Sequence, residues 1–390
     1  RRSPAAAFHG TLLHAMKSSN AKDLVQRLLS PSDVRIDGDR PWDLRIHHPR
    51  WYERVVSGGS LALGESYMDG WWDCEALDRF FDRIMRDRLD RRVKHHALRS
   101  LPTVLMAMIV NTQAGSRAFA IGRRHYDLGN RLFTAMLDPW LNYSCGYWEE
   151  AQTLNAAQET KLALICRKIG LQPGMKLLDV GCGWGGFAKF AAARYGATVH
   201  GVTVSREQAA FAEDFCSGLD VRIALQDYRD LRETYDRIVS IGMFEHVGFR
   251  NYRTFMRVMH RCLAKDGLFL LHTIGGNTSV RSTDPWIRTY IFPNSMLPSA
   301  EQIATASQGL FVIEDWHSFG SHYDPTLMAW HRNVTQRWDE LQDQYDDRFY
   351  RMWTYYLLSC AGSFRARRNQ LWQIVFSKYG IPGGYACRER

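Results

Sequence analysis

The chain has 390 residues, of which 45% are hydrophobic and 23% charged, and its formal net charge is +9. This composition excludes an intrinsically disordered chain, and the length suggests about two domains. No apolar run reaches the ~18 residues that a membrane-spanning helix needs, and the first residues do not resemble a signal peptide. The positive charge favours an anionic partner, although slightly basic surfaces are about as common without one.

Eight cysteines are spread along the chain without a C-x-x-C pair. This spacing argues against a disulfide framework and against a zinc site, so we expect a reducing, cytoplasmic setting and no bound metal. The cysteines are Cys74, Cys145, Cys166, Cys182, Cys216, Cys262, Cys360 and Cys387.

Residues 1–123 are expected to form a mainly helical domain, because apolar residues recur there at three- and four-residue spacing. One exception is 34–46, where alternating apolar residues around an Asp-Gly-Asp turn predict a small hairpin. Near the end of the domain, a basic stretch at 88–99 precedes the apolar segment 101–110. The basic stretch could rest on anionic phospholipid, or it could be a solvated helix face.

An irregular aromatic segment follows, between residues 123 and 158, and Pro139 and Gly146 interrupt it. Loops of this kind usually lie over a site rather than in a core. Tyr143, Ser144 and Cys145 are therefore candidates for a lid over a binding site.

The stretch LLDVGCGWGGF at 177–187 joins an apolar strand pattern to a helical one through several glycines. Glycine lets the backbone bend sharply and approach a ligand, and the following helix offers free N–H groups. A purely steric tight turn is the alternative. The D-x-G-x-G-x-G spacing, with Asp179 two residues before Gly181, differs from the dinucleotide fingerprint and resembles the S-adenosylmethionine loop of class I methyltransferases.

That resemblance implies an α/β fold in residues 124–390, with a seven-stranded, mostly parallel Rossmann-like sheet and helices on both faces. The cofactor would lie across the carboxyl ends of the strands. The strands are expected at 176–180, 197–204, 221–225, 235–242, 267–274, 311–319 and 371–378.

The second of these strands ends without the carboxylate that most class I methyltransferases place there to hold the ribose. Thr203 and Gln208 would have to substitute for it. Ser205 and Gln208 also form a capping-box pattern that predicts a helix over 206–215. Gln226 and Asp227 follow the third strand, where they could bracket the adenine.

Three further residues are ambiguous when each is taken alone. Glu245 ends the fourth strand, where substrates of open sheets bind, and it could be a general base, an orienting group or a helix-terminal charge. His272 lies within an apolar strand, where a histidine is more often a satisfied core residue. Tyr323 would ordinarily be an interface aromatic residue.

Eight motifs, taken together in order, resemble those of cyclopropane-fatty-acyl-phospholipid synthases over essentially the whole chain from about residue 20. The presence of the helical N-terminal domain makes the bacterial phospholipid-modifying type more similar than the mycolic-acid branch. The motifs are GESYMDGWW (64–72), HYDLGN (125–130), NYSCGYW (142–148), LLDVGCGWGGF (177–187), VTVSREQ (202–208), IGMFEHVG (241–248), IFPNSMLPS (291–299) and SCAGSFRAR (359–367).

The resemblance implies an enzyme that transfers a methylene from S-adenosylmethionine to a cis double bond in an acyl chain of a membrane phospholipid, with bound bicarbonate as the base. His272 and Tyr323 would donate hydrogen bonds to the anion, and Glu245 would accept its hydroxyl proton. The family's active-site positions correspond here to Cys145, Glu245, His272, Ile274, Tyr323 and Cys360. Its cofactor positions correspond to Tyr143 and Ser144 at the sulfonium, Gly181, Gly183 and Gly185 at the amino-acid part, Thr203 and Gln208 at the ribose, and Gln226 and Asp227 at the adenine. Asp179, just before these glycines, is a further candidate cofactor-binding residue.

The resemblance also implies partners. We expect a homodimer in the cytoplasm that associates transiently with the inner face of the membrane, with the N-terminal domain serving lipid docking or dimerisation. No nucleic-acid partner is expected, because no recognition module is present. Two alternatives stay open: a fatty-acid C-methyltransferase that leaves a methyl or methylene branch, and a non-catalytic lipid-binding relative.

The basic stretch yields the first testable prediction. Replacing Arg91, Arg92 and Lys94 together by Glu should weaken activity on anionic phospholipid vesicles, because it reverses the charge that would face the headgroups. Vesicle sedimentation and turnover would be measured side by side on the substituted and unsubstituted chains. Unchanged binding to anionic vesicles would exclude the basic stretch as a docking element.

Overall fold

The computed structural model describes residues 21–89, 130–280 and 282–386. By their contacts, the residues divide into two compact units. The first consists of 1–128, 284–293 and 338–368, and the second of 129–283, 294–337 and 369–390. Two segments that the division at residue 123 assigned to the catalytic domain, 284–293 and 338–368, thus belong to the first unit.

The first unit is built mainly from helices around an aromatic core. Trp72 and Trp286 are almost completely buried in it, and the Trp286 ring occupies the space that a side chain at Gly64 would need. The described elements are η1 (Ser30–Ser32), β1 (Arg45–Ile46), α2 (Trp51–Met68), β2 (Trp72–Asp73), α3 (Leu77–Arg86), α12 (Pro285–Tyr290), η6 (Trp338–Glu340) and α15 (Asp347–Arg365).

The hairpin expected at 34–46 is wrong. Strand β1 pairs antiparallel with β2, and Ile36 makes only an isolated bridge to Leu44. The buried Asp43 carboxylate accepts hydrogen bonds from the backbone N–H groups of Arg35 (2.8 Å) and Arg40 (3.2 Å). A side chain thereby takes donors that a hairpin ladder would have used.

The second unit contains a seven-stranded sheet in the order β5-β4-β3-β6-β7-β9-β8. Only β9 runs against its neighbours, so the predicted mostly parallel sheet is confirmed. The strands are β3 (Lys176–Val180), β4 (Thr198–Thr203), β5 (Val221–Leu225), β6 (Tyr235–Ile241), β7 (Leu263–Gly276), β8 (Val312–Ser318) and β9 (Asn369–Ser377).

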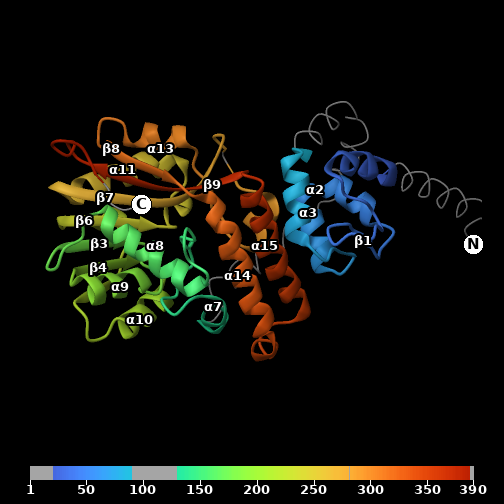
Figure 1. The fold of residues 1–390 in the computed structure, drawn as a ribbon, viewed down its shortest axis with the longest axis horizontal. Helices are drawn as coiled ribbons and strands as arrows, with labels where there is room; N and C mark the ends of the chain where they lie inside the picture. Colours follow the sequence, from blue (N-terminus) through green and yellow to red (C-terminus); the bar gives the residue numbers. More distant parts are fainter. Residues whose placement is uncertain (1–20, 90–129, 281, 387–390) are drawn as a thin grey trace, which may run out of the picture. The chain divides into compact units, whose positions relative to one another are not determined.

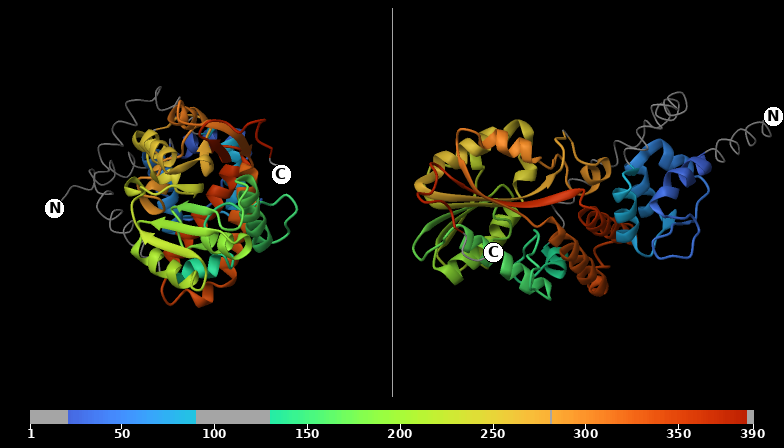
Figure 2. Two further views of the ribbon diagram at one scale, coloured as in Figure 1. Left: turned by 90° about the vertical axis from the view of Figure 1, so that its left-hand side faces the viewer. Right: turned by 45° about the horizontal axis from the view of Figure 1, so that its top comes forward.

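Helices cover both faces of this sheet (Figure 1). Side chains alternate along β3, so Leu177 packs in one core cluster with α8 and α9, and Leu178 in another with α11 and α13. Figure 2, right, shows these two helical layers on either side of the strands. The helical elements are α7 (Asn130–Met136), α8 (Leu154–Lys168), α9 (Gly186–Tyr195), α10 (Arg206–Phe215), η2 (Tyr228–Asp230), η3 (Phe244–His246), η4 (Phe249–Asn251), α11 (Tyr252–Cys262), α13 (Ala300–Ser307), η5 (Gly320–His322) and α14 (Tyr323–Gln336).

Three of the segments discussed from the sequence lie wholly or mostly outside the described residues. The basic stretch, apart from residues 88 and 89, lies outside the described residues, as do the apolar segment 101–110 and most of the HYDLGN motif. Among the described helices, none is both long and apolar enough to cross a membrane.

The glycine loop turns β3 into α9 with three left-handed residues, Gly181, Gly183 and Gly185, whose φ angles are 82°, 55° and 85°. Gly186 has a different role. A Cβ there would overlap the backbone carbonyl of Trp140, so this glycine allows the segment before the lid to lie against the loop.

We therefore expect Gly186→Ala to lower the free energy of unfolding by about 2 to 3 kcal/mol, because the backbone must move to make room for a methyl group. Gly218→Ala is the control, since its φ of 79° is left-handed but its surroundings are open. That substitution should cost about 1 kcal/mol. Urea unfolding would measure both, and equal losses would contradict the overlap.

Candidate active site

The glycine loop lies at the carboxyl edge of the sheet. The backbone N–H groups of Gly181 and Cys182 both donate to the carbonyl of Val202 at the end of β4, at 2.9 and 3.0 Å. Within the loop, the Trp184 indole donates to the side-chain oxygen of Asn130 at 3.0 Å. The loop is therefore held against the neighbouring strand on one side and the start of α7 on the other.

Asp179, just before the loop, is buried on β3. Its Oδ2 atom has no hydrogen-bond partner among the described residues. Burial raises the pKa of this carboxyl to about 7, and the nearby Lys161 ammonium opposes the rise. Because a buried polar atom normally has a partner, the unpaired oxygen is a candidate contact for a polar ligand group beside the glycine loop.

The predicted lid residues are held by helix α8. Lys161 is completely buried, and its ammonium donates to Ser144 Oγ at 2.9 Å and Asn142 Oδ1 at 3.0 Å. One turn earlier, Gln158 donates to the Ser144 carbonyl at 2.8 Å. Burial lowers the pKa of Lys161 to about 8, and the Asp138 carboxylate opposes that shift.

The Tyr143 ring packs against Phe133 and Trp330, with 5.2 Å between ring centroids in each case. The lid is thus fixed on both sides, by hydrogen bonds at Ser144 and by ring contacts at Tyr143. The role of Lys161 was missed in the sequence. The sequence feature that could have indicated this role is the three-residue spacing from Gln158 to Lys161, which places both side chains on the same face of α8.

The predicted ribose pair is assembled at the end of β4. Thr203 Oγ1 donates to Gln208 Oε1 at 3.1 Å and accepts from the Ser205 N–H at 3.2 Å. Ser205 caps α10 as expected, accepting from the Gln208 N–H at 3.3 Å. The capping box is only half formed, because the Gln208 side chain turns to Thr203 instead of the Ser205 backbone.

The predicted adenine pair follows β5. The Gln226 N–H donates to the Thr203 carbonyl at 2.9 Å, which places this segment beside the ribose pair. The Asp227 carboxylate accepts hydrogen bonds from Arg229 Nε at 2.9 Å and Nη2 at 2.6 Å. The Arg229 guanidinium holds the pKa of Asp227 below its usual value, so this carboxylate is ionised.

Glu245 lies in η3, directly after β6. Its Oε1 accepts a hydrogen bond from the backbone N–H of Ile274 on β7 at 2.6 Å, which joins the ends of the two strands. Its Oε2 is buried and has no partner among the described residues. Burial raises the pKa of Glu245 from 4.5 to about 7.

His272 lies on β7, two residues before Ile274, and only 1% of its surface is exposed. Its Nδ1 is 3.3 Å from Gln373 Nε2 on β9, and its Nε2 has no partner within the described part of the chain. Burial, with added repulsion from Lys161 and Lys168, holds the His272 pKa well below its usual value. His272 is therefore a neutral imidazole. Unlike an ordinary core histidine, it has a ring nitrogen without a hydrogen-bond partner among the described residues.

Cys145 lies beside Thr326 on α14, the helix that begins at Tyr323. Cys145 Sγ is 3.9 Å from Thr326 Oγ1, and the N–H of the next residue, Gly146, donates to the same oxygen at 3.1 Å. Thr326 lies one helical turn after Tyr323. Burial raises the pKa of the Cys145 thiol far above its usual value, so the sulfur is protonated.

The sixth predicted residue is placed differently. Cys360 lies on α15 and belongs to the first unit, whereas Cys145, Glu245, His272, Ile274 and Tyr323 belong to the second. Burial raises the pKa of the Cys360 thiol to about 12. An activated cysteine nucleophile needs the opposite shift.

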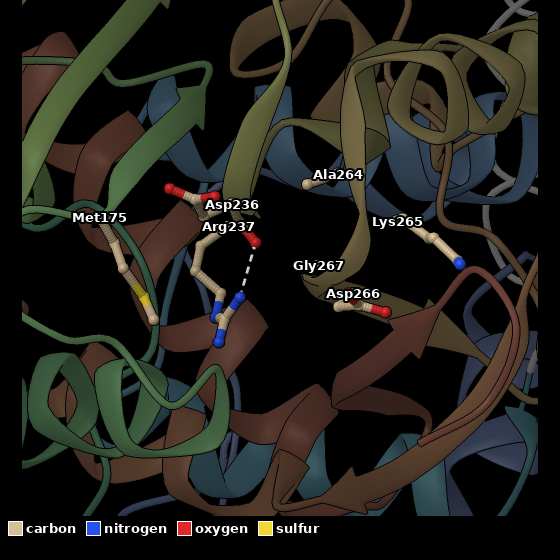
Figure 3. Close-up of a pocket in the computed structure, with 7 residues that line it drawn as sticks. All are labelled: Met175, Asp236, Arg237, Ala264, Lys265, Asp266 and Gly267. Carbon is tan, nitrogen blue, oxygen red and sulfur yellow. Dashed lines mark hydrogen bonds between the residues drawn. The ribbon is translucent and has the colours of Figure 1, made fainter. Parts of the chain in front are cut away.

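A pocket of about 360 Å³ lies at the other edge of the sheet, near the amino ends of β3, β6 and β7 (Figure 3). Arg237 in this pocket donates to the Asp236 carbonyl at 2.8 Å. Open parallel sheets bind their ligands at the carboxyl ends of the strands, so this pocket is separate from the candidate site. It is lined by Met175, Asp236, Arg237, Ala264, Lys265, Asp266 and Gly267.

The raised pKa of Glu245 has a consequence for stability. Unfolding releases this proton between about pH 4.5 and pH 7, so the burial penalty is absent at low pH and complete above pH 7. Glu245→Gln should therefore raise the free energy of unfolding by about 2 kcal/mol near pH 8 and by much less near pH 5. Denaturant unfolding at both pH values would measure the difference. An equal gain at both would contradict the shift.

The site can now be compared with known proteins. Residues 113–374 match the family described as "Mycolic acid cyclopropane synthetase". The chain is 52% identical over 361 residues to the cyclopropane-fatty-acyl-phospholipid synthase of Escherichia coli K12, covering 93% of this chain and 94% of that one. It is 37% identical over 268 residues to a probable fatty acid methyltransferase of Pseudomonas putida, covering 65% and 68%.

Solved structures agree with this. The cyclopropane synthase MmaA2 from Mycobacterium tuberculosis is 34% identical with a TM-score of 0.62, covering 68% of this chain and all of that chain. The mycolic acid cyclopropane synthase CmaA1, solved with SAH and CTAB, is 35% identical with a TM-score of 0.61, covering 67% and 98%. The chain therefore belongs to the cyclopropane synthetase family of S-adenosylmethionine-dependent methyltransferases.

Proposed function

We propose that this chain transfers a methylene group from S-adenosylmethionine to the cis double bond of an unsaturated acyl chain in a membrane phospholipid, forming a cyclopropane ring with bicarbonate as the base. The E. coli relative is named a cyclopropane-fatty-acyl-phospholipid synthase, which supports this type of product. One observation carries the proposed site. Among the described residues, Glu245 Oε2 and His272 Nε2 are both buried without a hydrogen-bond partner, and both residues lie at the carboxyl edge of the sheet that also carries the glycine loop.

The cofactor residues are those at the carboxyl ends of β3, β4 and β5. The left-handed glycines make the turn from β3 into α9, and the Oδ2 atom of Asp179, which has no partner among the described residues, would accept a hydrogen bond from the cofactor. Thr203 and Gln208 would hold the ribose, and Tyr143 and Ser144 would close over the sulfonium. When bound, S-adenosylmethionine supplies an electrophilic methyl group. The alkene π electrons form the new C–C bond to it as the C–S bond breaks, which leaves a cation on the acyl chain.

Ring closure then requires a base that removes a proton from the new methyl group. The chain fits a small anion for this purpose. His272 can donate from Nε2, the Tyr323 hydroxyl can donate as well, and Glu245 can accept a hydroxyl proton at Oε2. When bound, bicarbonate supplies an oxygen base that takes the methyl proton. The released C–H electron pair closes the ring.

The protonation states of the site protect it from its own intermediate. A cation on the acyl chain would alkylate a thiolate or another strong nucleophile beside it. Burial keeps the Cys145 thiol protonated because it raises the pKa of that group. A bound anion would in addition stabilise the developing positive charge.

Membrane contact is part of the proposal, with the first unit as the docking or dimerisation module of a homodimer. Trp71 in this unit stacks on His48 at 4.0 Å, and the Arg54 guanidinium lies 4.5 Å from its ring. Arg83 similarly lies 4.0 Å from the Trp42 ring. Tryptophan and basic side chains suit a phospholipid headgroup layer. The seven cysteines of the described residues are free thiols, which supports a cytoplasmic location at the inner face of the membrane.

The second candidate is a fatty-acid C-methyltransferase, favoured by the similarity to the P. putida protein. It shares the methyl transfer and differs in which proton the cation loses. Mass spectrometry of unsaturated phospholipid vesicles after incubation with the chain and S-adenosylmethionine separates the two. A gain of one methylene with loss of the alkene, reduced when bicarbonate is removed, supports the proposal. A product that keeps an alkene or carries a saturated branch favours the second candidate, and no product favours a non-catalytic lipid-binding role.

Glu245→Ala should nearly abolish turnover and leave S-adenosylmethionine binding unchanged, because the carboxylate serves the base and not the cofactor. Calorimetric binding and product formation would be measured on the same samples. Asp266→Ala, which removes an exposed carboxylate at the opposite edge of the sheet, is the control. Loss of cofactor binding in Glu245→Ala would contradict the assignment of Glu245 to the base.

The activity of the unsubstituted chain should fall as the pH drops through about 7, where Glu245 becomes protonated.

A further inference from the structure

Gln373 is a buried polar residue to which the sequence assigned no role. It lies on β9 and is completely buried. In the sheet register it stands opposite His272 on β7 and His317 on β8. Residues paired in this way point to the same face of a sheet, so the three form one polar row across neighbouring strands.

The atoms in contact between Gln373 and His272 determine which residue donates the hydrogen bond. The Gln373 amide nitrogen lies 3.3 Å from His272 Nδ1. An amide N–H can only donate, so Nδ1 must be the acceptor. A neutral imidazole carries one proton, and it must then be on Nε2. Nε2 is the ring atom that is buried without a hydrogen-bond partner among the residues that the structure describes.

We propose that Gln373 is a positioning residue that fixes the proton of His272 on Nε2, so that this atom donates to the anionic base. The inference rests on the proposed function, since it deepens the role of His272 in that site. With the amide reversed, Gln373 Oε1 would accept from an Nδ1–H group. Nε2 would then present a lone pair and repel an anion. The orientation of a single side-chain amide therefore decides whether His272 attracts or rejects the base.

The surroundings of His272 strengthen this dependence. Lys161 and Lys168 on α8 face the imidazole and disfavour a second proton on it. His272 therefore cannot become a donor at both nitrogens by taking up a proton. Its ability to donate from Nε2 depends on the tautomer that Gln373 selects.

Nitrogen-15 NMR of the full chain with labelled histidine tests this directly. The His272 signals are identified by their loss in His272→Asn. We expect a protonated Nε2 and an unprotonated Nδ1. A proton on Nδ1 of the unsubstituted chain overturns the proposal. In Gln373→Glu an ionised carboxylate can only accept from Nδ1, so at a pH at which this Glu is ionised the proton should move to Nδ1 or appear on both nitrogens, and an unprotonated Nδ1 at that pH would also overturn the proposal.

Kinetics supply the second test. Gln373→Leu should lower kcat by about tenfold, equivalent to one lost hydrogen bond, and weaken the bicarbonate dependence while leaving the KM for S-adenosylmethionine unchanged. Val375→Ala, on the same face of β9, is the control for disturbance of the strand and should have little effect. Equal losses in the two variants would reduce Gln373 to a packing residue. Bicarbonate-independent turnover in a chain with protonated Nε2 would refute the proposed base and leave the tautomer assignment standing.

Discussion

The site depends on the burial of ionisable groups at the carboxyl edge of the sheet. Glu245 and Asp179 are buried carboxyls whose pKa values rise to about 7, and each keeps one oxygen without a hydrogen-bond partner in the described part of the chain. Such groups destabilise a fold because burial removes their hydration. The chain tolerates them because their other contacts, such as the 2.6 Å hydrogen bond from the Ile274 N–H to Glu245, hold them in place. Burying these groups lowers the stability of the fold, but it provides polar atoms that can bind ligands.

The lid also depends on a buried ionisable group. Lys161 is buried, no carboxylate of the described residues lies within ion-pair distance of it, and it holds Asn142 and Ser144 through neutral oxygens. The next residue, Cys145, faces Thr326 on α14. One short segment therefore carries a predicted cofactor contact at Ser144 and a predicted base contact at Cys145. Under the proposed function, this adjacency would couple the placement of the methyl donor to the placement of the base.

Much of the fold followed from local patterns in the sequence. Apolar strand patterns and the glycine loop predicted the seven strands of the sheet, because the core requires apolar side chains on both of its faces. The hairpin at 34–46 was wrong because a side chain, Asp43, took the backbone donors. The grouping of 284–293 and 338–368 with the N-terminal part could not be predicted, since long-range contacts leave no periodic signal in the chain.

The candidate site was likewise only partly predictable from the sequence. Spacing and family resemblance predicted Glu245 and His272 as site residues, but their protonation states depend on burial, which appears only in three dimensions. Lys161 and Gln373 were missed because a lysine on a helix and a glutamine in a strand are ordinarily surface residues. Their roles come from register and helix face, which bring them to Ser144 and His272.

The central claim is that the transferred methyl group loses one proton to a base held by Glu245 and His272. The most direct test is mass spectrometry of cis-unsaturated phospholipid after incubation with the chain, bicarbonate and S-adenosylmethionine that carries three deuterium atoms on its methyl group. The account predicts a product that retains two deuterium atoms and has no alkene. A product that retains all three deuterium atoms would contradict it, because the base would then have removed a proton from the acyl chain.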